Sequence, residues 1–264
     1  MSIEEKDFTK AKHAFQIYLR DFDTKDDKIA LKVAHTMRVV QVAEEISTKM
    51  NLDKEDVLLA KFIGLLHDIG RFVQLKETGS FDDSIVPHAV LSNRILFDEG
   101  KIRNFIETDE YDNIMYESIK NHGVFKPDEI LTGRELLHSK IIRDADKIDN
   151  FHTKLIEDIP TMLDVTMEEL CMEDISEYAY NTFAAHEPLL NAKRETHLDM
   201  WISYIAYIYD LNFKESLEIV REHDYANRLF ERVNCKNENT YRKMGELSEI
   251  MEKYLQEKSC DAVK

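Results

Sequence analysis

A histidine and an aspartate that follow an apolar run are the two residues of this sequence best suited to chemistry. His67 and Asp68 come directly after Phe-Ile-Gly-Leu-Leu at 62–66, so we expect a helix to carry both into the protein interior. Burying an imidazole and a carboxylate together costs several kcal/mol unless a partner compensates them. A bound cation is the simplest such partner, and the pair therefore indicates a candidate metalloenzyme. The competing interpretation is a histidine favoured by the helix dipole beside a solvated aspartate.

A second histidine occupies the apolar face of a predicted helix. His35 precedes Val39, Val42 and Ile46 by four, seven and eleven residues, and this spacing places all four side chains on one face. Taken alone, His35 fits a core histidine with a single hydrogen bond. It becomes a candidate ligand only together with other metal-binding side chains.

Three further candidates lie at helix ends or at the edge of an apolar stripe. His88 follows Pro87 in the first turn of a predicted helix, where positive charge is disfavoured, so a neutral, metal-binding imidazole fits there. His122 ends a predicted helix, where a capping role would also explain it. On a long predicted helix, Asp146 sits at the edge of the apolar stripe and should face the interior, whereas Asp144 should point towards solvent.

The ordered series of these residues resembles the HD superfamily of metal-dependent phosphohydrolases. The resemblance covers about residues 30–151, and its strongest motifs are His-Thr-Met-Arg-Val at 35–39, Leu-Leu-His-Asp-Ile-Gly-Arg at 65–71 and Asp-Ala-Asp-Lys-Ile-Asp at 144–149. It implies an all-α bundle whose minimal metal site consists of His35, His67, Asp68 and Asp146. It also implies that His88 and His122 hold a second metal, with Asp68 as the candidate bridge.

Mixed imidazole and carboxylate ligands suit divalent transition metals, and ligand type does not select among Fe, Mn, Zn, Ni and Co. Two such ions could clamp phosphoryl oxygens and activate a water near neutral pH. The resemblance therefore implies hydrolysis of a phosphate monoester or diester of a nucleotide or another small phosphorylated metabolite. Asp68, Arg71 and Lys147 are the candidate catalytic residues. The two basic side chains could neutralise a phosphate, although a surface ion pair would explain them equally well.

Two other functions stay open at this point. Dinuclear-iron oxygenases of the inositol-oxygenase type resemble HD proteins and use the same six-residue pattern, but they consume oxygen rather than water. A non-catalytic, nucleotide-binding regulatory module is the third interpretation. The presence of His35, His67, Asp68 and Asp146 argues against it, because loss of a ligand is what such a module would show.

Helical periodicity dominates the elements that must position these residues. Only 7 Gly and 4 Pro occur in 264 residues, which favours long helices over hairpins. We predict helices over about residues 8–22, 29–50, 53–68, 87–97, 112–122, 133–157, 167–185, 197–211, 213–233 and 238–257. Gly70 should stop the third helix, and residues 74–86 should form an exposed loop. One all-α domain over residues 1–264 is predicted, with a metal-site core at about 30–151 and a C-terminal helical extension at about 160–257.

Charge and cysteine content limit the partners. The net charge of −17 argues against general nucleic-acid binding and against docking on anionic membranes. Cys171, Cys235 and Cys260 are scattered and odd in number, which is typical of free thiols in a reducing compartment. The sequence thus predicts a cytoplasmic protein that acts on a small phosphorylated substrate.

Overall fold

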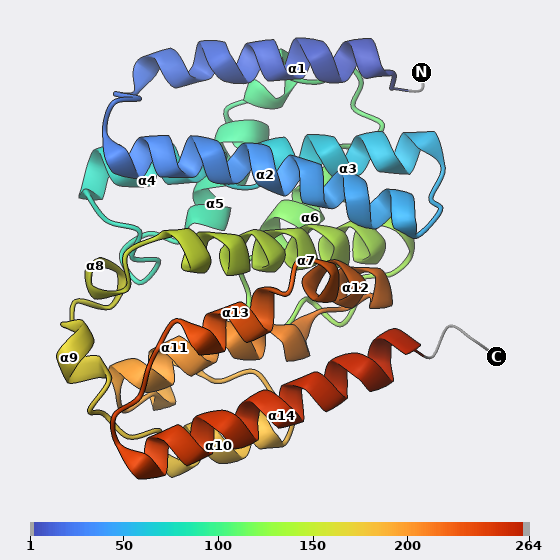
Figure 1. Ribbon diagram of the computed structural model, residues 1–264. Helices are drawn as coiled ribbons and strands as arrows, with labels where there is room; N and C mark the ends of the chain where they lie inside the picture. Colours follow the sequence, from blue (N-terminus) through green and yellow to red (C-terminus); the bar gives the residue numbers. More distant parts are fainter. Residues whose placement is uncertain (1–2, 261–264) are drawn as a thin grey trace. The chain divides into compact units, whose positions relative to one another are not determined.

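The computed structural model describes residues 3–260, and these residues form helices joined by turns, with no strand among them (Figure 1). The predicted all-α class is therefore confirmed. The contacts divide the chain into two compact units, residues 1–146 and 147–264, and each unit is described by itself. The boundary falls inside one long helix, close to the predicted end of the metal-site core. That the chain folds as one single domain stays a prediction.

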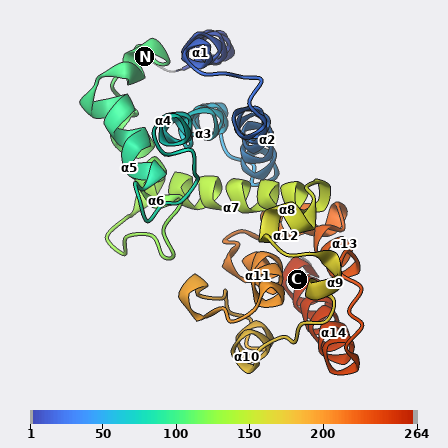
Figure 2. The same ribbon diagram turned by 90° about the vertical axis from the view of Figure 1, so that its left-hand side faces the viewer.

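The first unit contains the helices that carry the candidate ligands. They are α1 (Glu5–Tyr18), α2 (Asp27–Lys49), α3 (Lys54–Leu66), α4 (Ile69–Thr78), α5 (His88–Asn93), α6 (Asp112–Asn121) and the first part of α7 (Gly133–Ile156). Shorter 3-10 or π segments cover Leu19–Asp21, Arg94–Asp98 and Lys101–Asn104. In Figure 2, α1, α2, α3 and α4 are seen nearly end-on, so their axes run roughly parallel.

Side-chain caps fix where α2 and α3 begin, and one glycine allows the two helices to pack closely. The Asp26 carboxylate accepts hydrogen bonds from two backbone N–H groups of the first turn of α2, and Asp53 does the same for Asp56 of α3. These caps satisfy donors that have no partner within the helix. A Cβ on Gly64 would lie 3.2 Å from the Cα of Val40. Gly64 therefore allows the two helix backbones to approach closely.

The chain bends sharply between α3 and α4, at the His-Asp pair. Helix α3 ends at Leu66, His67 caps it, and Asp68 precedes α4. The prediction that Gly70 stops the helix is wrong, because the chain re-enters a helix at once and leaves it only at Gly79, whose φ is 68°. Gly70 instead serves a close approach, since a Cβ there would lie 2.6 Å from a backbone atom of α5. The exposed loop consequently begins at residue 79 and not at 74.

The second unit contains the end of α7 and a set of mostly short helices. They are α8 (Ile159–Leu163), α9 (Met167–Leu170), α10 (Glu177–Ala184), α11 (His197–Ile205), α12 (Lys214–Glu222), α13 (Tyr225–Glu231) and α14 (Glu238–Cys260), with 3-10 turns at Asn191–Lys193 and Ala206–Asp210. Trp201 is fully buried in the core of this unit, and its indole N–H donates to the Leu229 carbonyl over 3.1 Å. Helix α14 packs against α10, α12 and α13 (Figure 1).

Two helices predicted to be continuous in this unit are broken. The stretch 167–185 splits because the Ser176 side chain caps a new helix, α10, by accepting from Ala179 N. The stretch 213–233 splits at Asp224, which adopts φ 52° and so leaves the right-handed helical region. At Ser176 a short polar side chain competes with helical hydrogen bonding, whereas at Asp224 the left-handed backbone conformation itself ends the helix.

Further sequence predictions concern thiols and membranes. Cys171 and Cys235 are free and buried, whereas the side chain of Cys260 lies outside the part of the chain that the structure describes. Within the described residues, no helix combines the length and the apolar character needed to cross a bilayer.

Candidate metal centre

Six side chains from different elements of the first unit converge on one buried point. His35 comes from the middle of α2, and His67 and Asp68 from the bend between α3 and α4. The others stand at the start of α5, at the end of α6 and on α7, and they are His88, His122 and Asp146. The four histidines and Asp68 are buried, and the Asp146 side chain is 24% exposed. The structure thus brings together every metal ligand that the sequence predicts.

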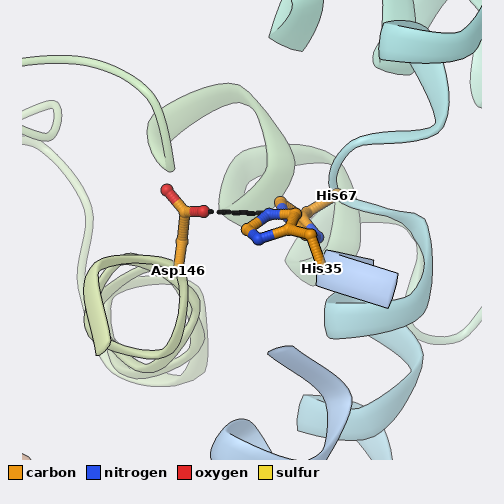
Figure 3. Close-up of side chains that lie close together, drawn as sticks. All are labelled: His35, His67 and Asp146. Atoms are coloured by element: carbon orange, nitrogen blue, oxygen red, sulfur yellow. Dashed lines mark ion pairs between the residues drawn. The ribbon is translucent and has the colours of Figure 1, made fainter. Parts of the chain in front are cut away.

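One half of the cluster gathers around Asp146. The Nε2 atom of His35 lies 3.2 Å from Asp146 Oδ1 and 3.6 Å from Asp68 Oδ2. His67 Nε2 lies 3.8 Å from the same Asp68 oxygen. Figure 3 shows the imidazoles of His35 and His67 facing the carboxylate of Asp146. One ligand atom from each of these three residues lies within 4.8 Å of the other two, a spacing compatible with one metal ion.

The other half of the cluster gathers around the second oxygen of Asp68. Asp68 Oδ1 lies 3.4 Å from His88 Nε2 and 3.7 Å from His122 Nε2. The two histidine nitrogens are 2.9 Å apart. Asp68 therefore presents one oxygen to His35 and His67 and the other to His88 and His122.

The protonation of the histidines follows from what their other ring nitrogens contact. Nδ1 of His67 lies 2.8 Å from Gly64 O, and Nδ1 of His122 lies 2.7 Å from Ile119 O. A carbonyl oxygen can only accept, so each Nδ1 carries a proton, and in a neutral imidazole the Nε2 atom then holds a lone pair. Nδ1 of His88 contacts a carboxylate in the same way, so in the neutral ring its Nε2 also holds a lone pair.

A cation resolves an otherwise unfavourable arrangement of these lone pairs. His67 Nε2 and Asp68 Oδ1 are buried without a hydrogen-bond partner, and the Nε2 atoms of His88 and His122 face each other at 2.9 Å. Leaving buried acceptors unpaired costs about 1–3 kcal/mol each. Two nitrogens each about 2.0–2.1 Å from one ion would be separated by about 3 Å, as these two are. The donor set therefore fits metal binding.

Burial also sets the charges of the cluster. It lowers the pKa of His67 to about 3, outweighing the opposing effect of Asp68, and it lowers the pKa of His88 as well. Burial alone would raise the pKa of Asp68, but nearby groups, first among them the positively charged Lys32, hold that pKa well below its usual range. Neutral imidazoles with ionised carboxylates are the protonation states that bind metals.

Lys32 belongs to the cluster although the sequence reasoning missed it. Its Nζ lies 2.8 Å from Asp68 Oδ2, and its side chain is 18% exposed. The Phe81 ring lies over the ammonium group, 5.3 Å away. Lys32 stands three residues before His35, so both point to the same face of α2. That spacing was a signal in the sequence that could have identified it.

The basic residues predicted to be catalytic have other partners in the structure. Arg71 donates to the carboxylate of Asp83, to Gln74 and to the Phe81 carbonyl, and its Nε lies 3.7 Å from Asp68 Oδ1. Lys147 belongs to the second unit and forms an ion pair with Asp210 at 3.0 Å. A catalytic role for either residue stays a prediction.

The expectation that Asp144 points to solvent is wrong. Its side chain is fully buried, because α7 is buried all along 141–145 and not on one stripe alone. Within that stretch, the buried Arg143 guanidinium donates to the carbonyls of Asn121 and Phe125, and so closes the end of α6 beside His122. A single sequence stripe cannot reveal burial on two faces of a helix.

Residues 33–150 match the family model of the HD domain, a range close to the predicted core at about 30–151. Curated proteins and solved structures gave no significant match. The matched range contains all six side chains of the cluster.

Proposed function

We propose, from the match of residues 33–150 to the HD-domain family model, that the chain is a metal-dependent phosphohydrolase with a dinuclear site. Proteins with this domain are generally metal-dependent hydrolases. The proposed reaction is hydrolysis of a phosphate monoester or diester in a nucleotide or another small phosphorylated metabolite.

The observation that carries the proposal is the position of Asp68 between two sets of histidines. His35 and His67, with Asp146, would hold one ion, and His88 with His122 would hold the other. Asp68 would contact both, since its two oxygens face different sets. When bound, divalent ions would supply a water of lowered pKa and positive charge for the phosphoryl oxygens; Fe, Mn, Zn, Ni and Co all suit the donor set.

The chain's own residues would orient the ions and add charge. The protons on the Nδ1 atoms of His67 and His122 aim each Nε2 inward. Lys32 adds a positive charge beside Asp68, and it is a candidate to contact a substrate phosphate together with the predicted Arg71 and Lys147. The net charge of −17 and the free, buried Cys171 and Cys235 support a cytoplasmic protein that is no general nucleic-acid binder and does not dock on membranes.

Phosphate release from a panel of nucleotides, sugar phosphates and phosphodiesters tests the proposal. The full chain loaded with Mn²⁺, Zn²⁺ or Fe²⁺ should release phosphate or cleave a diester, and Asp68→Asn should abolish this activity. The matched control His13→Gln changes an exposed histidine and should leave the activity unchanged. If the iron-loaded protein instead consumes oxygen with a polyol or a phosphonate and hydrolyses no ester, the oxygenase alternative replaces the proposal.

A further inference from the structure

His88 differs from the neighbouring histidines in how its proton is held. His67 and His122 follow the last turns of α3 and α6, and each gives its Nδ1 proton to the carbonyl three residues earlier. The carbonyls of a last helical turn lack helical partners and are therefore available. His88 is the first residue of α5, and a first turn offers unpaired N–H groups rather than carbonyls. His88 must find its acceptor elsewhere.

The loop that precedes α5 supplies this acceptor in the form of Asp83. Nδ1 of His88 lies 2.7 Å from Asp83 Oδ1 and 2.8 Å from Oδ2. The backbone N–H of His88 donates to Asp83 Oδ1 as well, over 3.2 Å. One carboxylate thus fixes both the ring and the backbone of His88, and it satisfies a donor at the helix start.

Two side chains of α4 hold Asp83 in turn. Arg71 donates to the two oxygens of Asp83 through two nitrogens, at 2.9 and 3.2 Å. The fully buried Gln74 donates to Asp83 Oδ1 at 3.1 Å and to the Val86 carbonyl at 2.7 Å. Arg71 also donates to the Phe81 carbonyl at 2.9 Å. The loop is therefore fastened to α4 on both sides of Asp83.

This arrangement is more specific than a surface ion pair. Although the Asp83 side chain is 45% exposed, the Arg71 side chain is only 12% exposed, and paired two-point contacts fix direction as well as distance. Partners that orient a metal-binding histidine typically change metal affinity about 10–100-fold when they are removed.

We infer that Asp83, held by Arg71 and Gln74, is a positioning residue that aims His88 Nε2 at the space beside Asp68 Oδ1 and thereby sets the affinity of the second metal. The inference rests on the proposed dinuclear function. It also gives Arg71 a role through Asp83 and His88, distinct from direct contact with a substrate phosphate.

Titration of the metal-free full chain with Mn²⁺, followed by calorimetry and by electron paramagnetic resonance, tests the inference. Coupled pairs of Mn²⁺ and single Mn²⁺ ions give different spectra, so each site can be followed without any activity assay. Asp83→Asn should weaken the second Mn²⁺ about 10–100-fold and leave the first unchanged, and Asp83→Ala should do the same. The matched control is Asp82→Asn. Asp82 is an exposed neighbour in the same loop, and its side chain accepts a hydrogen bond from Ser84 N and not from His88.

Thermal unfolding in chelator is the control for folding. Both variants should unfold cooperatively, as expected for a change in an exposed loop. Wild-type affinity for both ions in Asp83→Asn and Asp83→Ala would overturn the inference, as would equal weakening of both sites or a wild-type protein that binds a single Mn²⁺. If the wild type binds two Mn²⁺, only the second weakens in the variants, and no ester is hydrolysed, the inference holds and the proposed reaction fails.

Discussion

Lys32 and Asp68 form a partly buried ion pair in the candidate metal site, with Nζ 2.8 Å from Oδ2. The lysine approaches the same oxygen that faces His35 and His67. It therefore balances part of the charge that a metal ion would otherwise balance. This relationship makes the stability of the metal-free protein depend on Lys32 more than that of the metal-loaded protein.

Lys32→Met tests that dependence. In chelator, we expect the free energy of unfolding to fall by about 1.5–3 kcal/mol, the usual value for a hydrogen bond to a charged group. With Mn²⁺ the loss should shrink, because a bound cation replaces the lysine charge and binds the released carboxylate more tightly. Urea unfolding with and without Mn²⁺ measures both values. Lys25→Met, a change at an exposed lysine, should have little effect; an equal loss in both conditions for Lys32→Met would contradict the prediction.

The two histidine sets around Asp68 predict different metal stoichiometries. His122→Ala removes a nitrogen that lies 3.7 Å from Asp68 Oδ1 and 2.9 Å from His88 Nε2, so the protein should bind one Mn²⁺ in place of two. Asp68→Asn should weaken both ions, because its oxygens face both sets. Metal analysis after gel filtration measures the ratio. Two tightly bound ions in His122→Ala would show that this histidine is not a ligand.

Much of the site was predictable because its ligands follow helical spacing and residue chemistry. A short window of sequence is enough to recognise His35 on the apolar face of α2 and the His-Asp pair after an apolar run. Asp83 was not predictable, since its role depends on Arg71 and Gln74 from the preceding helix folding back onto an irregular loop. No local pattern encodes such a contact.

The wrong predictions of helix boundaries have a related cause. Gly70 has the local preferences of a helix stop, yet it lies inside α4 because two helices approach each other there. At Asp224 the chain adopts a left-handed conformation within an apolar pattern that otherwise favours one continuous helix. Periodicity predicts which face of a helix is buried, but tertiary packing decides where the helix begins and ends.

The stability of the metal-free protein should fall in mild acid. The pKa of His67 is about 3 in the folded state against an ordinary 6.5, and the pKa of His88 is also lowered. Between these values the unfolded chain binds protons that the folded chain does not, so the free energy of unfolding decreases as the pH falls from about 6.5 towards 3. The slope should approach about 1.4 kcal/mol per pH unit for each such proton.

Urea unfolding in chelator between pH 7 and 4.5 measures this slope above the range in which most carboxylates titrate. In His67→Gln the free energy of unfolding should depend less steeply on pH, because the unfolded chain no longer takes up a proton at residue 67. His13→Gln should keep the wild-type slope, since His13 is exposed. A wild-type protein whose stability does not change over this range would contradict the assignment of His67 as a neutral, buried imidazole.

Two helical glycines should respond oppositely to the same substitution. A Cβ at Gly70 would lie 2.6 Å from the carbonyl oxygen of His88 and from the backbone nitrogen of Ser92, and neither backbone atom can move without displacing α5. Gly70→Ala should therefore destabilise the protein by about 1–3 kcal/mol and weaken the second Mn²⁺ through the shift of His88. At Gly245 of α14 a Cβ meets nothing within 4 Å, so Gly245→Ala should stabilise by about 0.5–1 kcal/mol. Urea unfolding midpoints measure the stability of both variants, and Mn²⁺ titration measures the affinity of the second site. Equal stabilisation of the two would mean that α4 and α5 do not approach as closely as the structure has them, and the position of His88 would lose its support.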